Sequence, residues 1–246
     1  MKPAGQEAQS QSEATWPKTF APLSAEQKKI SDDFMKYWHE VLPRRYGMVD
    51  RFNHTYPVQN APTEFLRTLE VGAGLGEHLG YEHLTEVQRR NYYAIDIRDN
   101  MVAELRRRHP EVNSVVADCQ ERLDFPDGHF DRILAIHVLE HLPNLPAALH
   151  EIRRVSKETV GTLSVVIPCE GGFAYSLARR ISAQRIFEKR YGQSYEWFIE
   201  REHINRPFEI VRELERYFKV IHRFYFPLVV SSIAANLCIG MTLRPR

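Results

Sequence analysis

Apolar residues between positions 65 and 168 recur in two alternating patterns. Short apolar runs of strand length stand at 65–71, 91–97, 112–117, 130–136 and 161–167. Between them, residues 101–109 and 145–156 carry apolar side chains at helical spacing, the second with Pro146 in its first turn, where proline is favoured. Strands that alternate with helices pair in parallel, so this part of the chain predicts a doubly wound α/β sheet.

The chain on either side of this region follows other patterns. Residues 24–46 have the apolar spacing of a helix, and residues 47–62, with two prolines, predict a looser connector. Residues 171–204 interrupt the alternation with an aromatic and basic stretch that is compatible with helices. After it, the pattern predicts a helix at 206–218 and strands at 219–226 and 236–243.

These patterns divide the chain into four parts. We expect a disordered polar tail at 1–20, a helical cap segment at 21–60 and a main α/β domain at 61–246. Within that domain, residues 171–204 form a helical lid. The tail lacks the apolar stretch of a secretory signal.

Composition narrows the classes of protein that fit. The formal net charge is +1, which argues against the basic surface of a nucleic-acid-binding domain. Three widely spaced cysteines favour a reduced, cytoplasmic protein. Residues 224–243 carry no charge and are long enough for a membrane span. Ser231, Ser232 and Asn236 instead favour a connection between two buried strands.

The segment "LEVGAGLGEH" carries the strongest chemical signal. Glu70 stands at the end of a predicted strand, and Gly72, Gly74 and Gly76 follow at alternate positions. Glycines permit a sharp turn and close approach of the backbone to a ligand. The spacing is one residue tighter than in the dinucleotide fingerprint G-x-G-x-x-G. A carboxylate before the first glycine suits a ligand with an amine or sulfonium charge better than a pyrophosphate.

Two further acidic residues end neighbouring strands. Asp96 follows Gly76 by 20 residues and can accept hydrogen bonds from both hydroxyls of a ribose. Asp118, beside Cys119, ends the third strand and can reach an adenine amino group. Ligands of open α/β sheets bind at the carboxyl ends of the strands, where all these residues fall.

With these segments the chain resembles the class I S-adenosylmethionine-dependent methyltransferases. The matching stretches are "LEVGAGLGEH", "YYAIDIRDNMV", "ADCQERLDFPDGHFDRILAIHVLEHLPN" and "AALHEIRRVSKETVGTLSVVIP". The resemblance covers residues 65–168, and the closing helix and strands by layout. It implies a Rossmann-like sheet of seven strands with the last strand antiparallel, and S-adenosyl-L-methionine as the cofactor.

The resemblance also implies a set of cofactor-binding residues: Glu70, Gly72, Ala73, Gly74, Asp96, Ile97, Met101, Asp118, Cys119 and His137. The glycines and Glu70 approach the methionine part of the cofactor, and Asp96 holds the ribose. Ile97 and Met101 flank the adenine. Asp118 and Cys119 contact its edge.

The stretch "HVLEH" at 137–141 matches the pattern H-x-x-E-H of zinc proteases, which requires one continuous helix. Here an apolar strand precedes it and two prolines follow, so we expect the end of a strand and a turn. The stretch is also similar to the E-x-x-E-H of quinone-pathway O-methyltransferases, which can hold a divalent cation. His137 replaces the first carboxylate, a hard oxygen ligand, so we expect no metal.

The acceptor should lie between the N-terminal helix and residues 171–204. Aromatic residues are frequent there: Trp38, His39, Tyr46, Phe173, Tyr175, Tyr191, Tyr195, Trp197, Phe198 and His203. They either line an acceptor pocket or pack the lid itself. Methylation of a hydroxyl benefits from a base near neutral pH, so His137 and His203 are the catalytic candidates.

We therefore expect an enzyme that methylates a small-molecule acceptor, most simply at oxygen. One alternative is a lipid-linked or anionic glycan or isoprenoid acceptor at a membrane surface, since Phe173, Leu177 and Ile181 share one side of a basic helix. Another is a cofactor-binding protein without catalysis. The sequence lacks the N/D-P-P-Y/F tetrapeptide of base-methylating enzymes, so no nucleic-acid partner is expected. It gives no oligomeric state.

Overall fold

A seven-stranded sheet forms the centre of the computed structural model, which describes residues 15–45 and 47–246, with side chains 38–45 outside the description. The strands are β1 (Thr68–Val71), β2 (Tyr92–Asp96), β3 (Asn113–Val116), β4 (Arg132–Ile136), β5 (Thr162–Pro168), β6 (Phe218–Phe226) and β7 (Cys238–Pro245). Their order is β3-β2-β1-β4-β5-β7-β6. Only β7 pairs antiparallel, with both β5 and β6. The predicted topology, with an antiparallel last strand, is confirmed.

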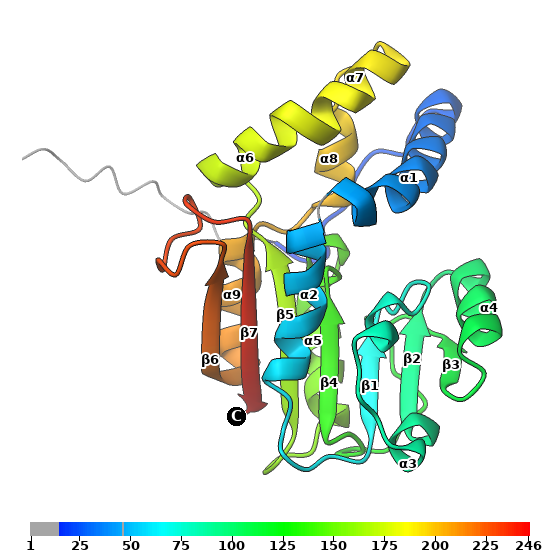
Figure 1. The fold of residues 1–246 in the computed structure, drawn as a ribbon, viewed down its shortest axis with the longest axis vertical. Coiled ribbons are helices and arrows are strands. Elements are labelled where there is room, and N and C mark those ends of the chain that lie inside the picture. The colour runs from blue at the N-terminus through cyan, green and yellow to red at the C-terminus, as the bar shows by residue number, and fades with distance from the viewer. Residues whose placement is uncertain (1–14, 46) are drawn as a thin grey trace, which may run out of the picture.

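Helices cover both faces of this sheet (Figure 1). On one face, α2 (Gly47–Gln59) packs against β4, β5 and β7. On the other, α5 (Leu145–Val155) and α9 (Pro207–Tyr217) contact each other. Shorter elements at the β1–β3 end are η1 (Glu77–Gly80), α3 (Glu86–Arg90) and α4 (Asp99–Arg108).

Burial of the central strands follows from this double cover. Every residue of β1 and β5 is buried, and Leu69, Ile133 and Leu163 are fully inaccessible. Parallel strands that are covered on both faces have continuous apolar runs instead of alternation. The apolar runs of the sequence thus predict which strands lie in the middle of the sheet.

The lid stands above the carboxyl ends of the strands (Figure 1). It consists of α6 (Phe173–Arg179), the π-helix η3 (Arg180–Gln184), α7 (Arg185–Tyr191) and α8 (Glu196–Glu202). The N-terminal helix α1 (Ala25–Arg45) packs against it, with the ring of Phe34 5.0 Å from that of Phe187 and 5.2 Å from that of Phe198. The lid and α1 therefore share a small aromatic core of their own.

The segment 47–62 corrects one prediction, because most of it is the helix α2 and not a loose connector. Pro57 lies in the last turn, where Asn60 closes the helix by donating from its backbone and side-chain amides to the Tyr56 carbonyl. The Tyr56 ring lies so close to Gly240 that an added Cβ there would be 2.6 Å away. Packing against β7 thus outweighs the weak helical pattern.

The N-terminal tail contacts the domain before α1 begins. Residues 1–14 of the expected disordered tail lie outside the described residues. Among the residues that follow, Trp16 packs against the main core. The Lys18 ammonium donates to the Ile204 carbonyl at 2.8 Å and to Glu209 at 2.7 Å. These contacts hold the chain beside α9.

The uncharged run at 224–243 forms the end of β6, a connection and most of β7, as predicted. Asn236 is fully buried in the connection, where its side-chain amide donates to the carbonyls of Val230 and Ser232. Among the described helices, none has the length and apolar character needed to cross a bilayer.

A mostly buried histidine in α2, His54, makes stability depend on pH. Burial, with the charges of His78 and His137, lowers the pKa of His54 from 6.5 to about 3. Below pH 6.5 the unfolded state therefore binds more protons at this histidine than the folded state does. The stability that neutral His54 contributes is complete above pH 6.5 and declines as pH falls. We expect the unfolding free energy to lose about 2 kcal/mol between pH 7 and pH 5 through this group.

Urea unfolding at the two pH values measures this effect. His54→Gln should remove that share of the pH dependence, whereas the exposed His83→Gln should leave it intact. An equal pH dependence in wild type and His54→Gln would show that other groups cause it.

Candidate functional site

The turn after β1 has the conformation that its glycines allow. Gly72, Gly74 and Gly76 all have positive φ, at 66°, 55° and 83°. Between them, the amide of Ala73 donates to the Ile95 carbonyl at 3.0 Å and so ties the turn to β2. We call residues 72–76 the glycine turn. Its backbone lies at the carboxyl end of the sheet, next to the acidic ends of neighbouring strands.

Gly72 has a second constraint besides its φ. A Cβ at this position would lie 2.2 Å from the Cγ2 atom of Val138, whereas a Cβ at Gly74 would have Glu77 Oε2 as its nearest neighbour, at 3.4 Å. Gly72→Ala should therefore lower the unfolding free energy by about 2–5 kcal/mol, through overlap plus backbone strain. The matched Gly74→Ala should cost about 1–2 kcal/mol, from strain alone.

Chemical denaturation of both variants tests the difference. Equal losses for the two glycines would mean that the loop of Val138 moves aside without cost. A larger loss for Gly72→Ala would establish that the loop after β4 packs rigidly on the glycine turn.

Asp96 ends β2 and faces this turn. Its carboxylate accepts hydrogen bonds from the amide of Gly74 at 3.1 Å and from the amide and side chain of Arg98, both at 3.0 Å. Burial by itself would raise the pKa of Asp96, but the Arg98 bonds outweigh it and hold the pKa below the usual value. Arg98 Nη2 also reaches the second oxygen at 3.3 Å. Arg98 was not predicted from the sequence.

The residues expected at the adenine lie on the next strand ends. Ile97 is 62% exposed, as a residue that lies against a ligand must be, and Met101 is half-buried. The Asp118 carboxylate accepts from the amide of Gln120 at 2.9 Å and from its side chain at 3.1 Å. Burial raises the pKa of the Cys119 thiol to about 12, so this cysteine is a neutral packing group.

Glu70 points into the protein. It is almost fully buried, and the Tyr92 hydroxyl donates to its carboxylate at 2.7 Å. Burial raises the pKa of this carboxyl above its usual value. In this structure Glu70 fixes the base of the glycine turn, and its contact with a cofactor stays a prediction.

The stretch 137–141 does not lie on one helix, in agreement with its sequence context. His137 follows β4 with a positive φ of 52°, and the 3₁₀-helix η2 (Leu139–His141) comes after it. His137 Nδ1 lies 3.0 Å from the Oε1 atom of Glu140, which is fully buried. A carboxylate only accepts here, so His137 Nδ1 carries the hydrogen and Nε2 the lone pair. Nε2 is buried without a partner among the described residues.

Burial alone would raise the pKa of Glu140. The hydrogen bond from His137 and the charges of the neighbouring histidines outweigh this and lower the pKa to about 2. Glu140 is thus an anion that is surrounded by imidazoles.

His203 has the same arrangement on the lid side. Its Nδ1 lies 3.1 Å from Glu170 Oε2, and Arg179 pairs with the other oxygen of that carboxylate. Both side chains of the His203–Glu170 pair are mostly buried, at 16% and 13% exposure. The pair joins the end of α8 to the loop after β5, 33 residues apart in sequence. Because the Glu170 carboxylate accepts this hydrogen bond, His203 Nδ1 carries the hydrogen and His203 Nε2 carries the lone pair.

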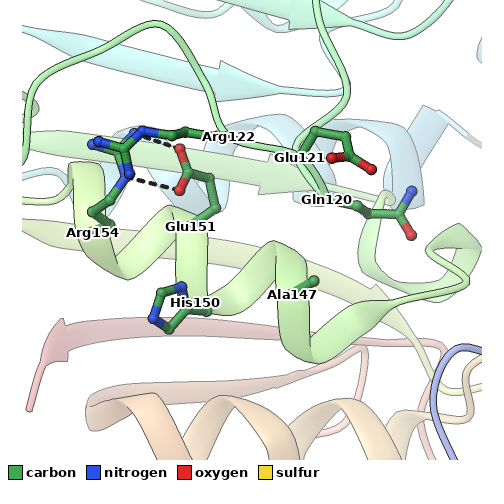
Figure 2. Close-up of a pocket in the computed structure, with 7 residues that line it drawn as sticks. All are labelled: Gln120, Glu121, Arg122, Ala147, His150, Glu151 and Arg154. Carbon is green, nitrogen blue, oxygen red and sulfur yellow. Dashed lines mark hydrogen bonds and ion pairs between the residues drawn. The ribbon is translucent and has the colours of Figure 1, made fainter.

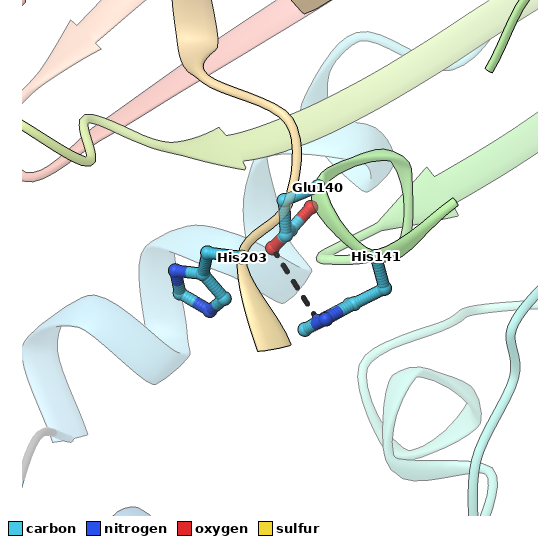
Figure 3. Close-up of side chains that lie close together, drawn as sticks. All are labelled: Glu140, His141 and His203. Carbon is cyan, nitrogen blue, oxygen red and sulfur yellow. Dashed lines mark ion pairs between the residues drawn. The ribbon is translucent and has the colours of Figure 1, made fainter. Parts of the chain in front are cut away.

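His141 completes a group of side chains from two parts of the chain (Figure 3). Its Nδ1 bonds to the Glu202 carbonyl, and its ring lies 5.2 Å from that of His203. One ligand atom each of Glu140, His141 and His203 lies within 4.8 Å of the others. Carboxylate oxygens and imidazole nitrogens placed in this way can coordinate a divalent ion. The expectation of no metal stays a prediction.

Asn205 fastens the lid to this loop. It is fully buried, and its side-chain amide donates to the carbonyls of Leu139 at 2.7 Å and Leu142 at 2.8 Å. Its backbone amide donates to the Glu140 carbonyl at 3.0 Å. The sequence alone does not predict this role, because the partners are more than 60 residues away.

The glycine turn with Asp96 and the group of histidines below the lid adjoin. Val138 packs on Gly72, and Arg98 acts electrostatically on Glu202, next to His203. The structure therefore brings Asp96, the glycine turn, His137 and His203 to one edge of the sheet. Of the expected aromatic wall, Tyr195 and Phe198 are buried in the core that the lid shares with α1, while the side chains of Trp38, His39 and Tyr46 lie outside the described residues.

A surface hollow of about 300 Å³ lies elsewhere, between α5 and the loop after β3 (Figure 2). Arg154 donates to both carboxylate oxygens of Glu151 along its wall. His150 and Gln120 also line it. The hollow contains neither the glycine turn nor His203, so it is separate from the site described above.

Comparison with known proteins agrees with this geometry. Residues 69–160 match the family model described as a methyltransferase domain. A solved structure from Pyrococcus horikoshii superposes with a TM-score of 0.60 at 16% identity, covering 86% of this chain and 99% of that one. A methyltransferase structure from Aquifex aeolicus superposes with a TM-score of 0.52 at 18% identity, covering 82% of this chain and 97% of that one. Among curated proteins, no sequence matches this chain.

A third structure was determined with a ligand. It is a 1,6-didemethyltoxoflavin N1-methyltransferase from Burkholderia thailandensis with bound S-adenosylhomocysteine, with a TM-score of 0.55 at 18% identity, covering 92% of this chain and 93% of that one. At such identities the likeness shows the fold. Residues 69–160 thus match a methyltransferase domain, and the chain as a whole has the fold of class I S-adenosylmethionine-dependent methyltransferases.

Proposed function

We propose that this methyltransferase transfers the methyl group of S-adenosylmethionine to an oxygen atom of a small-molecule acceptor. The observation that carries the choice of oxygen is the His203–Glu170 pair, because it presents a lone pair on His203 Nε2 at the acceptor side of the sheet edge. The Burkholderia enzyme methylates nitrogen, so the fold alone leaves the acceptor atom open.

The cofactor would lie across the glycine turn. The amide-rich turn, with its positive φ values, would meet the methionine part, and Asp96 would accept from the ribose hydroxyls. To do so, Asp96 would exchange the side-chain bonds of Arg98 for ribose hydroxyls. Ile97 and Met101 would flank the adenine, and Asp118 would meet its amino group. The bound S-adenosylhomocysteine of the Burkholderia enzyme supports S-adenosylmethionine as the cofactor.

The acceptor would bind between the cofactor and the lid. S-adenosylmethionine would supply an electrophilic methyl group. An O–C bond to the acceptor would form as the C–S bond of the cofactor breaks, which would give the methyl ether and S-adenosylhomocysteine. His203 Nε2 takes the hydroxyl proton, and Glu170, fixed by Arg179, stabilises the imidazolium that forms. His137, held by Glu140, is the second candidate for this role.

Two measurements test the proposal. Calorimetric titration with S-adenosylhomocysteine should show binding that survives chelator treatment. A transfer assay with methyl-labelled cofactor and a panel of phenols, alcohols and amines should label hydroxyl compounds first. Binding without transfer to any acceptor class would favour a cofactor-binding protein without catalysis. Transfer to amines alone would refute the oxygen acceptor.

Two further expectations belong to this proposal. The three cysteines are free and buried, which supports the cytoplasm as the setting. No nucleic-acid partner is expected, since the chain has no basic surplus. A mobility shift with duplex DNA or RNA at low salt would contradict that.

A further inference from the structure

Six large apolar side chains are exposed on one part of the surface. Phe173, Leu177 and Ile181 lie along α6 and η3, and Leu228, Val229 and Val230 lie in the connection between β6 and β7. Each is at least half exposed, and Val229 is 79% exposed. We call these six residues the docking face. Scattered exposed apolar residues are normal, but a group of six bulky ones indicates a contact surface.

The two segments of the docking face are held side by side. The amide of Ala174 donates to the Ala234 carbonyl at 2.9 Å. Gly172 lies so close to the Ile233 carbonyl that a Cβ would be 2.3 Å from its oxygen. Figure 1 shows the start of α6 beside the β6–β7 connection. The sequence indicated only the apolar side of the helix at Phe173, Leu177 and Ile181. The structure adds Leu228, Val229 and Val230, which follow Ile181 by 47 or more positions.

The charges within the two segments of this face have one sign. Residues 171–187 contain three arginines and no acidic residue, and residues 227–237 contain no charge at all. Arg179 pairs with Glu170, whereas Arg180 and Arg185 are exposed on the same helical segment as Ile181. An apolar stripe bordered by arginines complements the interface of a bilayer with anionic headgroups.

We propose that the docking face rests on an anionic membrane surface. The six apolar side chains would enter the interfacial region, and Arg180 and Arg185 would meet the lipid phosphates. Glu170, which orients His203, lies only three residues before Phe173. The entrance to the site would thus face the membrane. The acceptor would then be an amphiphilic molecule held in the bilayer, an inference that rests on the proposed function, whereas membrane binding does not.

Co-sedimentation of the full chain with vesicles tests the proposal. We expect binding to phosphatidylcholine vesicles that contain phosphatidylglycerol, weaker binding to pure phosphatidylcholine, and a decline as salt rises. The double variant Phe173→Ser with Val229→Ser should bind on the order of tenfold or more weakly, because it removes two of the most exposed apolar groups. Arg180→Gln with Arg185→Gln should lose mainly the preference for anionic lipid.

The control is Val87→Ser, an exposed apolar residue on α3 at the opposite end of the sheet (Figure 1). It should bind vesicles like the wild type. S-adenosylhomocysteine binding by all variants shows that they are folded and keeps the cofactor site separate from this test. No sedimentation at low salt would overturn the proposal. So would a stable dimer in light scattering that Val229→Ser dissociates, because a second copy would then cover the face.

Discussion

His203→Gln is expected to lower kcat by about 100-fold to 10,000-fold, the usual range for removal of a general base. Glutamine keeps a similar length and can hold a hydrogen bond to Glu170, but it cannot accept the proton of an acceptor hydroxyl at neutral pH. The cofactor residues are untouched, so the affinity for S-adenosylhomocysteine should stay within about twofold. Steady-state kinetics on a hydroxyl acceptor found in the transfer assay, with calorimetry beside it, measures both.

A positioning variant separates catalysis from structure. Glu170→Gln, which acts through His203, should lower kcat less than His203→Gln does. The control is the exposed His150→Gln on α5. Full activity of His203→Gln would contradict the assignment and direct attention to His137. Loss of wild-type activity on chelation, restored by a divalent ion, would make Glu140, His141 and His203 metal ligands instead.

Asp96→Ala is expected to weaken binding of S-adenosylhomocysteine by about 30-fold to 1,000-fold. Its carboxylate would accept two hydrogen bonds from the ribose, and bonds to a charged group contribute about 1.5–3 kcal/mol each, of which part is recovered by water. The side chain also fixes the Gly74 amide, so its loss loosens the glycine turn as well. Calorimetric titration gives the two dissociation constants directly.

A neighbouring acid provides the matched control for Asp96. Asp99 is exposed at the start of α4, three residues further on, and Asp99→Ala should bind the ligand nearly as wild type does. Arg98→Ala should bind it as well or better, since Arg98 competes for the same carboxylate. If Asp96→Ala binds like the wild type, the ligand does not reach the end of β2 and the proposed cofactor position is wrong.

The sequence predicts the sheet well because the features that determine it are local. Buried parallel strands appear as unbroken apolar runs, as in "GTLSVVI", and the positive φ values of the glycine turn need residues without a Cβ. The helix α2 was missed for the opposite reason. Its residues have weak helical spacing and a proline, and it is stabilised by Tyr56 packing on Gly240, a contact between residues 184 positions apart.

Site residues were predictable where their position or their type alone pointed to them. Asp96 and His137 stand where a strand ends, and His203 is a histidine on the expected acceptor side. Their roles stay predictions. Glu170 and Asn205 were not predicted, since their roles come from partners on other elements. Arg98 was missed because any arginine near an acid is unremarkable in sequence. Residue types indicate what chemistry is available, whereas orientation depends on packing across the whole chain.

The aromatic core between α1 and the lid has a consequence for motion. Phe34 contacts Phe187 and Phe198, so α7 and α8 cannot swing away without carrying α1 with them or breaking these ring contacts. Any opening of α7 and α8 would then move α1 together with them. Product release, often the slow step in enzymes that close over their substrates, would depend on α1, a helix that ends more than 120 residues before the lid begins.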